Sequence, residues 1–248
     1  MIKIDQSIRF FIKPWLVLLT ILFVIIFYVF LDKQFALMLY RAQLESRMPI
    51  LNAFTFLGST KLSFIILLLL AFYFRSSCCI KNICSKYIAH KVSYSWLLPN
   101  LKSVAEARVW FLIMSMSVTS ALCGLLKCLL GRARPMMWIE HQQFGFYWFK
   151  ITYDYWSFPS GHTTTIVSLA LGLSVLFPRY TRGFLFFALC IVVSRVLLLQ
   201  HYLSDVLATS LLVFIEMGFL IGFLKSKQWL AVAFDSAVLQ PTKKGRTK

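Results

Sequence analysis

The sequence predicts an all-α integral membrane protein, a single domain over residues 1–248 built as a bundle of six transmembrane helices with both termini cytoplasmic. The chain is 59% hydrophobic and only 14% charged, whereas a soluble domain is nearer half apolar and a quarter charged. Six apolar segments are long enough, or nearly so, to cross a hydrocarbon core of about 30 Å. They lie near residues 13–31, 52–74, 109–130, 161–178, 183–200 and 203–224.

The distribution of positive charge predicts the orientation. A formal net charge of +17 could indicate nucleic acid binding, but the basic residues lie between apolar runs, so no nucleic acid partner is predicted. With both termini in the cytoplasm, 17 of the 26 Lys and Arg residues fall on cytoplasmic segments. This is the bias that the positive-inside rule describes, and an even number of spans places both termini on that side.

The first span follows a basic N-terminus and extends from Trp15 to Leu31. It is too long for a typical signal-peptide core, and no small-residue cleavage site follows it. We therefore expect an uncleaved anchor. Residues 32–51 are predicted to form the first outer loop, with a surface helix around Gln34–Arg47.

The other connections are predicted from breaks in the hydropathy. Gly58 and Lys61 interrupt the second apolar segment, so its outer end is not fixed. Residues 75–108 are predicted to form the main cytoplasmic connection, with an interfacial turn at Tyr94–Leu101. The tail over residues 225–248 is basic and suits a surface of anionic lipid.

Three polar segments lie at span ends, and the predicted orientation brings all three to the outer face. The first ends the third span, the second opens the fourth, and the third brackets the turn between the fifth and sixth. Unrelated matches would not be expected to converge, so the sequence predicts one site. The segments are Lys127 to Arg134-Pro135, Pro159-Ser160-Gly161-His162, and Ser194-Arg195 to His201 and Asp205.

Residue types and spacings in the first two segments suit an oxyanion. Lys127 and Arg134 are seven residues apart, about two helical turns, and can share a face. Arginine offers a planar fork to phosphate oxygens and lysine a movable point charge, although each could also be a charge that extends to the membrane surface. Ser160 and Gly161 open a helix whose N-terminus favours anions, with His162 in its first turn.

The third segment pairs an imidazole with a carboxylate. His201 and Asp205 are at positions i and i+4, which face each other on a helix. A carboxylate bonded to one imidazole nitrogen fixes the tautomer and leaves the other nitrogen as a nucleophile or base. Arg195 lies one to two turns earlier at a similar membrane depth. An interfacial His-Asp pair without a role is the alternative.

Together the three segments resemble the signature of the type 2 phosphatidic acid phosphatase superfamily, which also includes vanadium-dependent haloperoxidases. Every signature position between residues 127 and 205 matches in order and spacing. The resemblance implies a metal-independent, cofactor-free hydrolase of lipid phosphate monoesters or diphosphates. The compact six-span layout resembles the bacterial members, which implies the inner membrane and a site facing the periplasm.

The resemblance also implies a role for each signature residue. His201 would attack phosphorus and form a phosphohistidine, Asp205 would orient His201, and His162 would protonate the leaving oxygen. Water would then release phosphate. The other signature residues would hold the phosphoryl oxygens and stabilise the charged transition state: Lys127, Arg134, Ser160, Gly161 and Arg195.

The sequence leaves the lipid open among undecaprenyl diphosphate, phosphatidylglycerol phosphate, lipid A phosphate and phosphatidic acid. The aromatic-rich stretch 136–158 suits a wedge that admits a lipid laterally, although an interfacial aromatic belt has the same composition. A lipid-phosphate transporter or binding protein is disfavoured by the complete catalytic set, and a haloperoxidase-like vanadate enzyme by the transmembrane composition. The oligomeric state is not predicted.

Two polar features lie outside the predicted site. Cys78, Cys79 and Cys84 have no histidine or acid to complete a zinc-like spacing, so reduced thiols and no metal are predicted. Glu216 is an acid well inside a span, about 16 Å along a helix from Asp205. That is too far for phosphoryl chemistry, and a hydrogen bond to a neighbouring helix is predicted instead.

Overall fold

Helices account for nearly all the regular structure of the protein. The computed structural model describes residues 13–43, 48–87 and 97–226, without the side chains of residues 76–103 and 225–226. These residues form helices and turns, with one isolated antiparallel bridge between Arg132 and Phe146 and no strand. The predicted all-α class is thereby confirmed.

Four helices in the described part of the chain are long and apolar enough to cross a membrane. A bent helix pair makes a fifth candidate span, and α9 (Gly161–Leu176) is a shorter apolar helix of 16 residues. A helical bundle with four to five candidate membrane spans is therefore confirmed. The number of six spans and the cytoplasmic termini stay predictions. The four candidate spans are Pro14–Ala42, Val104–Leu130, Pro178–Leu197 and Leu203–Leu224.

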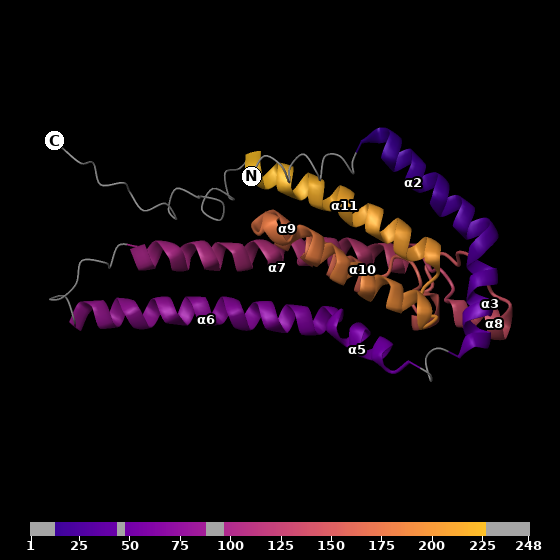
Figure 1. The fold of residues 1–248 in the computed structure, drawn as a ribbon, viewed down its shortest axis with the longest axis horizontal. Coiled ribbons are helices and arrows are strands. Elements are labelled where there is room, and N and C mark those ends of the chain that lie inside the picture. The colour runs from indigo at the N-terminus through magenta and orange to yellow at the C-terminus, as the bar shows by residue number, and fades with distance from the viewer. Residues whose placement is uncertain (1–12, 44–47, 88–96, 227–248) are drawn as a thin grey trace.

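The first span continues past its predicted end without a loop. Helix α2 (Pro14–Ile26) passes through a π-helical turn, η1 (Phe27–Leu31), into α3 (Asp32–Ala42). A π turn inserts one extra residue into the helical register, and the chain bends where α2 meets α3 (Figure 1). The predicted surface helix thus exists, but it begins at Asp32 as an extension of the span, and its predicted end at 44–47 lies outside the described residues.

Two helices take the place of the predicted second span. Helix α5 (Ile50–Leu57) meets α6 (Thr60–Tyr87) at a 47° break. A Cβ atom added to Gly58 would lie 2.4 Å from Cγ2 of Ile191, so the break lies in close contact with the helix that carries Ile191. The interruption predicted at Gly58 is therefore a bend against a neighbouring helix.

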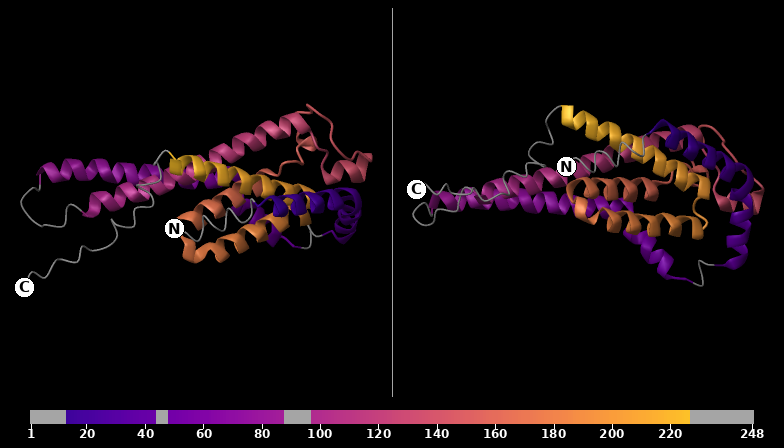
Figure 2. Two further views of the ribbon diagram at one scale, coloured as in Figure 1. Left: turned by 90° about the horizontal axis from the view of Figure 1, so that it is seen from above. Right: turned by 45° about the horizontal axis from the view of Figure 1, so that its top comes forward.

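The connection predicted at residues 75–108 is largely helical. Helix α6 extends to Tyr87 and α7 (Leu97–Leu130) begins ten residues later, so the two project beyond the other helices (Figures 1 and 2). The predicted turn is wrong for Leu97–Leu101, and its first residues lie outside the described chain. The segment contains no glycine, and Pro99 falls in the first turn of α7, where proline is tolerated.

Helix α9 is the centre of the bundle. It packs against α7, α11 (Leu203–Ser226) and α10 (Thr181–Leu197), and 11 of its 16 residues are buried. A Cβ atom on Gly172 would lie 2.7 Å from Cδ2 of Leu112, which shows how closely α9 approaches α7. Because other helices cover α9, it need not present a full-length apolar surface to lipid.

The helices around α9 bring the three signature segments to one end of the bundle. Helices α7 and α10 end there, and α9 and α11 begin there (Figure 1). The short helix α8 (Pro135–His141) packs against α3 at the same end. The convergence that the sequence predicts is therefore present in the structure.

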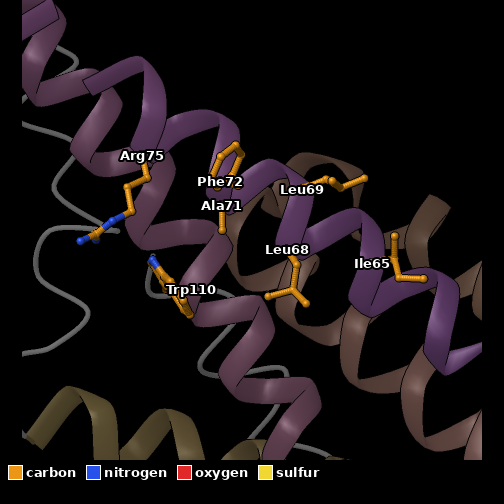
Figure 3. A pocket seen from close by; sticks show the side chains of 7 residues that line it. All are labelled: Ile65, Leu68, Leu69, Ala71, Phe72, Arg75 and Trp110. Atoms are coloured by element: carbon orange, nitrogen blue, oxygen red, sulfur yellow. The ribbon is translucent and has the colours of Figure 1, made fainter. Parts of the chain in front are cut away.

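A groove of about 490 Å³ lies between α6 and α7, away from that end (Figure 3). Its lining is apolar except for one arginine, and no signature residue contributes to it. The groove is therefore separate from the candidate site. Its lining residues are Ile65, Leu68, Leu69, Ala71, Phe72, Arg75 and Trp110.

Gly131, directly after α7, has a conformation that only glycine adopts without strain. Its φ is +55°, and an added Cβ would lie 2.7 Å from the backbone oxygen of Tyr147. We expect Gly131→Ala to lower the unfolding free energy in detergent micelles by about 1–3 kcal/mol. Gly183→Ala in α10 is the matched control, because an added Cβ there meets nothing within 4 Å. Equal destabilisation of the two variants would contradict the assignment.

Candidate functional site

Lys127 lies in the last turn of α7, beside the first turn of α9. Its Nζ donates a hydrogen bond to the backbone oxygen of Trp156 at 3.0 Å. The same Nζ would lie 4.0 Å from a Cβ atom on Gly161. The first two signature segments are thus in contact, as the sequence predicts.

Two arginines complete a group of three cations. Arg134 precedes α8; its Nε donates to the backbone oxygen of Tyr153 at 3.0 Å, and its Nη1 donates to Oε1 of Gln200 at 2.6 Å. Arg195 lies in the last turn of α10, and its Nη1 donates to Oγ1 of Thr55 at 3.1 Å. The buried Nε of Arg195 has no hydrogen-bond partner in the described structure.

The partners of these three cations are neutral. Among the described residues, none of Lys127, Arg134 and Arg195 forms an ion pair with a carboxylate. All three act electrostatically on both His162 and His201, so they lie near both imidazoles. Positive charge without a carboxylate partner, in surroundings of low dielectric constant, favours binding of an anion.

The N-terminus of α9 faces this space. Ser160 caps the helix, since its Oγ accepts hydrogen bonds from the backbone nitrogen of Thr163 at 3.4 Å and from Oγ1 of Thr163 at 3.0 Å. The backbone nitrogen of Ser160 in turn donates to Oγ1 of Thr209 at 2.9 Å. With the cap fixed in this way, the free N–H groups of the first turn have a defined direction for an anion.

His201 lies in the turn between α10 and α11, 3% exposed. Its Nδ1 donates to the backbone oxygen of Ser157 at 2.6 Å, so the proton is on Nδ1 and the lone pair is on Nε2. Burial, together with the charges of Arg134, Lys127 and Arg195, lowers the pKa of His201 well below its ordinary value. The imidazole is therefore neutral, with Nε2 available as a nucleophile.

The predicted hydrogen bond between Asp205 and His201 is not formed. Asp205 instead accepts hydrogen bonds from Oγ of Ser157 at 2.6 Å and from the backbone nitrogen of Tyr202 at 2.9 Å, and it pairs with Arg132. Helix α11 begins at Leu203, so His201 precedes the helix and the i, i+4 geometry does not apply. Asp205 reaches His201 indirectly, because Ser157 bonds Asp205 through its hydroxyl and His201 through its carbonyl.

Sequence reasoning missed a buried ionic cluster beneath these residues. Arg132, 2% exposed, donates from Nη2 to Oδ2 of Asp32 at 2.7 Å and from Nη1 to Asp205 and to Oγ of Ser204 at 2.9 Å. Burial disfavours the charged guanidinium, but Asp205 and Asp32 outweigh this effect and raise the pKa of Arg132. Two signals were present in the sequence: an arginine two residues before Arg134, and an acid directly after the first apolar run.

The loop between α8 and α9 folds back onto residues 131–134. The backbone nitrogen of Ala133 donates to Gly145 at 3.0 Å, and that of Ser157 donates to Arg132 at 3.0 Å. The loop therefore holds Ser157, the partner of His201, in place. It also exposes large side chains of the predicted aromatic wedge, including Trp148 (63% exposed) and Phe149 (70% exposed).

Glu216 and the loop cysteines stay outside the site. The Oε2 atom of Glu216 is buried without a hydrogen-bond partner in the described residues, so the predicted bond to a neighbouring helix is not made through this atom. The side chains of Cys78, Cys79 and Cys84 lie outside the described structure. Among the described residues, no group of three or more His, Cys, Asp or Glu side chains could hold a metal ion.

The fold and the site together define a class of protein. It is an apolar helical bundle with a buried histidine and three cations at one end. The family model described as the PAP2 superfamily matches residues 108–229, which include every signature residue. This part of the chain belongs to the superfamily.

Curated relatives carry a more specific name. The chain is similar to the lipid A 1-phosphatases of Rhizobium johnstonii and Rhizobium etli, at 36% identity over 117 residues, or 45% of this chain. The match covers 48% and 50% of those proteins, so the chain spans about half the length of these relatives. No solved structure matches the chain at a significant level.

The neutral His201 predicts an acid-dependent loss of stability. Because its pKa is lowered on folding, the unfolded chain takes up a proton below about pH 6.5 that the folded chain does not. The contribution of His201 to the unfolding free energy is therefore fully present above that pH and is lost on acidification. Its slope is up to about 1.4 kcal/mol per pH unit. Unfolding measured between pH 7.5 and 5 should show a smaller slope for His201→Gln than for the wild type.

The exposed His141 provides the control for that titration. Its side chain is 58% exposed, so His141→Gln controls for replacing a histidine outside the buried site. A slope that is unchanged by His201→Gln would show that His201 is not held neutral.

Proposed function

We propose that the protein is a membrane lipid phosphatase that hydrolyses a lipid phosphate or diphosphate on the periplasmic face of the inner membrane through a phosphohistidine at His201. The observation that carries this proposal is a buried neutral imidazole surrounded by three cations whose partners are neutral. Membership of the PAP2 superfamily and the similarity to lipid A 1-phosphatases support it.

The first step transfers the phosphoryl group to His201. Lys127, Arg134 and Arg195 hold the phosphate oxygens, together with the N-terminus of α9 at Ser160 and Gly161. The Nε2 lone pair of His201 forms the bond to phosphorus while the bond to the lipid oxygen breaks. The negative charge of the bound phosphate offsets the nearby cations and lets His162, in the first turn of α9, hold a proton, which it then gives to that oxygen.

The second step reverses the roles around phosphorus. A water attacks the phosphohistidine, and His162 takes the water proton. The phosphorus–nitrogen bond breaks, and its electron pair returns to Nε2 of His201 as inorganic phosphate leaves. Throughout both steps the carbonyl of Ser157 keeps the Nδ1 proton in place, and Asp205 supports the positive charge of the phosphorylated imidazole through Ser157.

For the substrate, we propose a lipid A phosphate as the first candidate, on the basis of the two relatives. Undecaprenyl diphosphate, phosphatidylglycerol phosphate and phosphatidic acid share the phosphate chemistry and belong in the same assay. The exposed loop side chains beside Arg134 suit contact with lipid, since Trp148, Phe149, Ile151 and Tyr153 all project from the surface at this end.

Phosphate release in detergent micelles tests this function directly. We expect the wild type to release phosphate from at least one of the four lipids, equally with and without EDTA. His201→Gln should reduce turnover by at least about a thousandfold, because the nucleophile is lost. His141→Gln is the control and should keep the wild-type rate.

Two results would contradict this function. Unchanged turnover in His201→Gln would exclude the proposed nucleophile. Lipid binding by the wild type without phosphate release from any of the four lipids would instead indicate a binding protein or transporter.

The exposed aromatic side chains predict a separable effect on lipid substrates. Replacing Trp148 and Phe149 together with alanine should lower kcat/KM for a micellar lipid phosphate by about tenfold or more, because each side chain loses apolar contact with lipid. A short-chain water-soluble phosphate should be hydrolysed at the wild-type rate. Tyr180→Ala is the control, because this exposed aromatic precedes α10 and so lies at the opposite end of that helix from Arg195. Equal losses on both substrates would refute a role in lipid access.

A further inference from the structure

We infer that Asp32 and Arg132 form a positioning pair for His201, which makes the N-terminal helix α2–α3 part of the active site. This inference rests on the proposed function and adds to it. Asp32 lies outside the residues matched by the PAP2 model, which begin at 108. The signature alone therefore does not contain the complete site.

Asp32 is committed to this role by its surroundings. It is 1% exposed and accepts three hydrogen bonds. They come from Nη2 of Arg132 at 2.7 Å, from the backbone nitrogen of Ser204 at 3.1 Å, and from the hydroxyl of Ser204. A buried carboxylate with this many donors fixes both Arg132 and the first turn of α11 relative to α3.

A continuous chain of bonds leads from Arg132 to the nucleophile. Nη1 of Arg132 pairs with Asp205, which accepts a hydrogen bond from Oγ of Ser157 at 2.6 Å. The carbonyl oxygen of Ser157 accepts from Nδ1 of His201 at 2.6 Å. The orientation of the His201 ring therefore depends on Ser157, and that of Ser157 depends on the ion cluster.

Aromatic rings restrict the Arg132 guanidinium from the other sides. Its Cζ lies 4.9 Å from the ring centre of Tyr28, 4.8 Å from that of Tyr202 and 5.5 Å from that of Phe146. Tyr28 precedes Asp32 by four residues, and both contact Arg132, so this face of the helix is aimed at the guanidinium. The π-helical turn between residues 27 and 31 sets that register.

The charge balance separates Arg132 from the three cations of the anion site. Arg132 is paired with two buried carboxylates, whereas Lys127, Arg134 and Arg195 have only neutral partners. Arg132 thus positions other residues of the site, whereas the three cations are free to bind the phosphate. Its loss or the loss of Asp32 should disturb turnover more than the affinity for substrate.

Asp32→Asn tests this positioning role, because it keeps the shape of the side chain and removes its charge. We expect kcat to fall about 10–100-fold while KM stays within about threefold, as for partners that orient a reacting group. Glu140→Gln is the matched control, a carboxylate-to-amide change on α8 at the same end, and it should leave both constants unchanged. If Asp32→Asn fails to fold, Ser204→Ala takes its place as the test, because it removes one hydrogen-bond donor to Asp32. We expect a smaller loss of kcat in this variant.

A second readout is independent of turnover. The imidazole ¹⁵N resonances of His201, assigned with His201→Gln, should move in Asp32→Asn and stay in place in Glu140→Gln. Unchanged resonances together with a wild-type kcat per folded molecule would overturn the inference, even if the variant is less stable. If the wild type hydrolyses none of the lipids, the proposed function fails, and the resonances alone decide whether Asp32 positions His201.

Discussion

The site depends on three positive charges that are held close together without carboxylate partners. Lys127, Arg134 and Arg195 come from three different elements, and a carbonyl, an amide and a hydroxyl fix their positions without neutralising them. Their mutual repulsion is a cost that a bound phosphate would remove, so binding of an anion is favoured. Burial and these same charges keep His201 neutral, which preserves its lone pair for attack on phosphorus.

A second group of charged residues lies beside these cations and has a structural role. Arg132, with Asp32 and Asp205, forms a neutralised and deeply buried cluster that fixes where α3, α11 and the loop before α9 meet. Ser157 then transmits that geometry to His201. A buried ion cluster adds little net stability but is costly to break on one side, so this arrangement specifies one conformation of the nucleophile.

Much of this architecture follows from the sequence, and the exceptions have physical reasons. Hydropathy and charge distribution predict the helices and the end at which Lys127, His162 and His201 converge. Contact between Asp32 and Arg132 joins residues 100 positions apart and depends on a π turn, which no periodicity of the sequence indicates. The hydrogen bond predicted between His201 and Asp205 fails because α11 begins after His201, a boundary that spacing alone does not give.

The stereochemical course at phosphorus tests most directly whether His201 attacks phosphate within this cationic site. A lipid thiophosphate made chiral with ¹⁸O would be hydrolysed by the purified protein in ¹⁷O-labelled water, and the configuration of the released thiophosphate determined. Two successive in-line displacements, first by His201 and then by water, predict overall retention of configuration. Inversion would show that water attacks the lipid phosphate directly, and would contradict a covalent intermediate on His201.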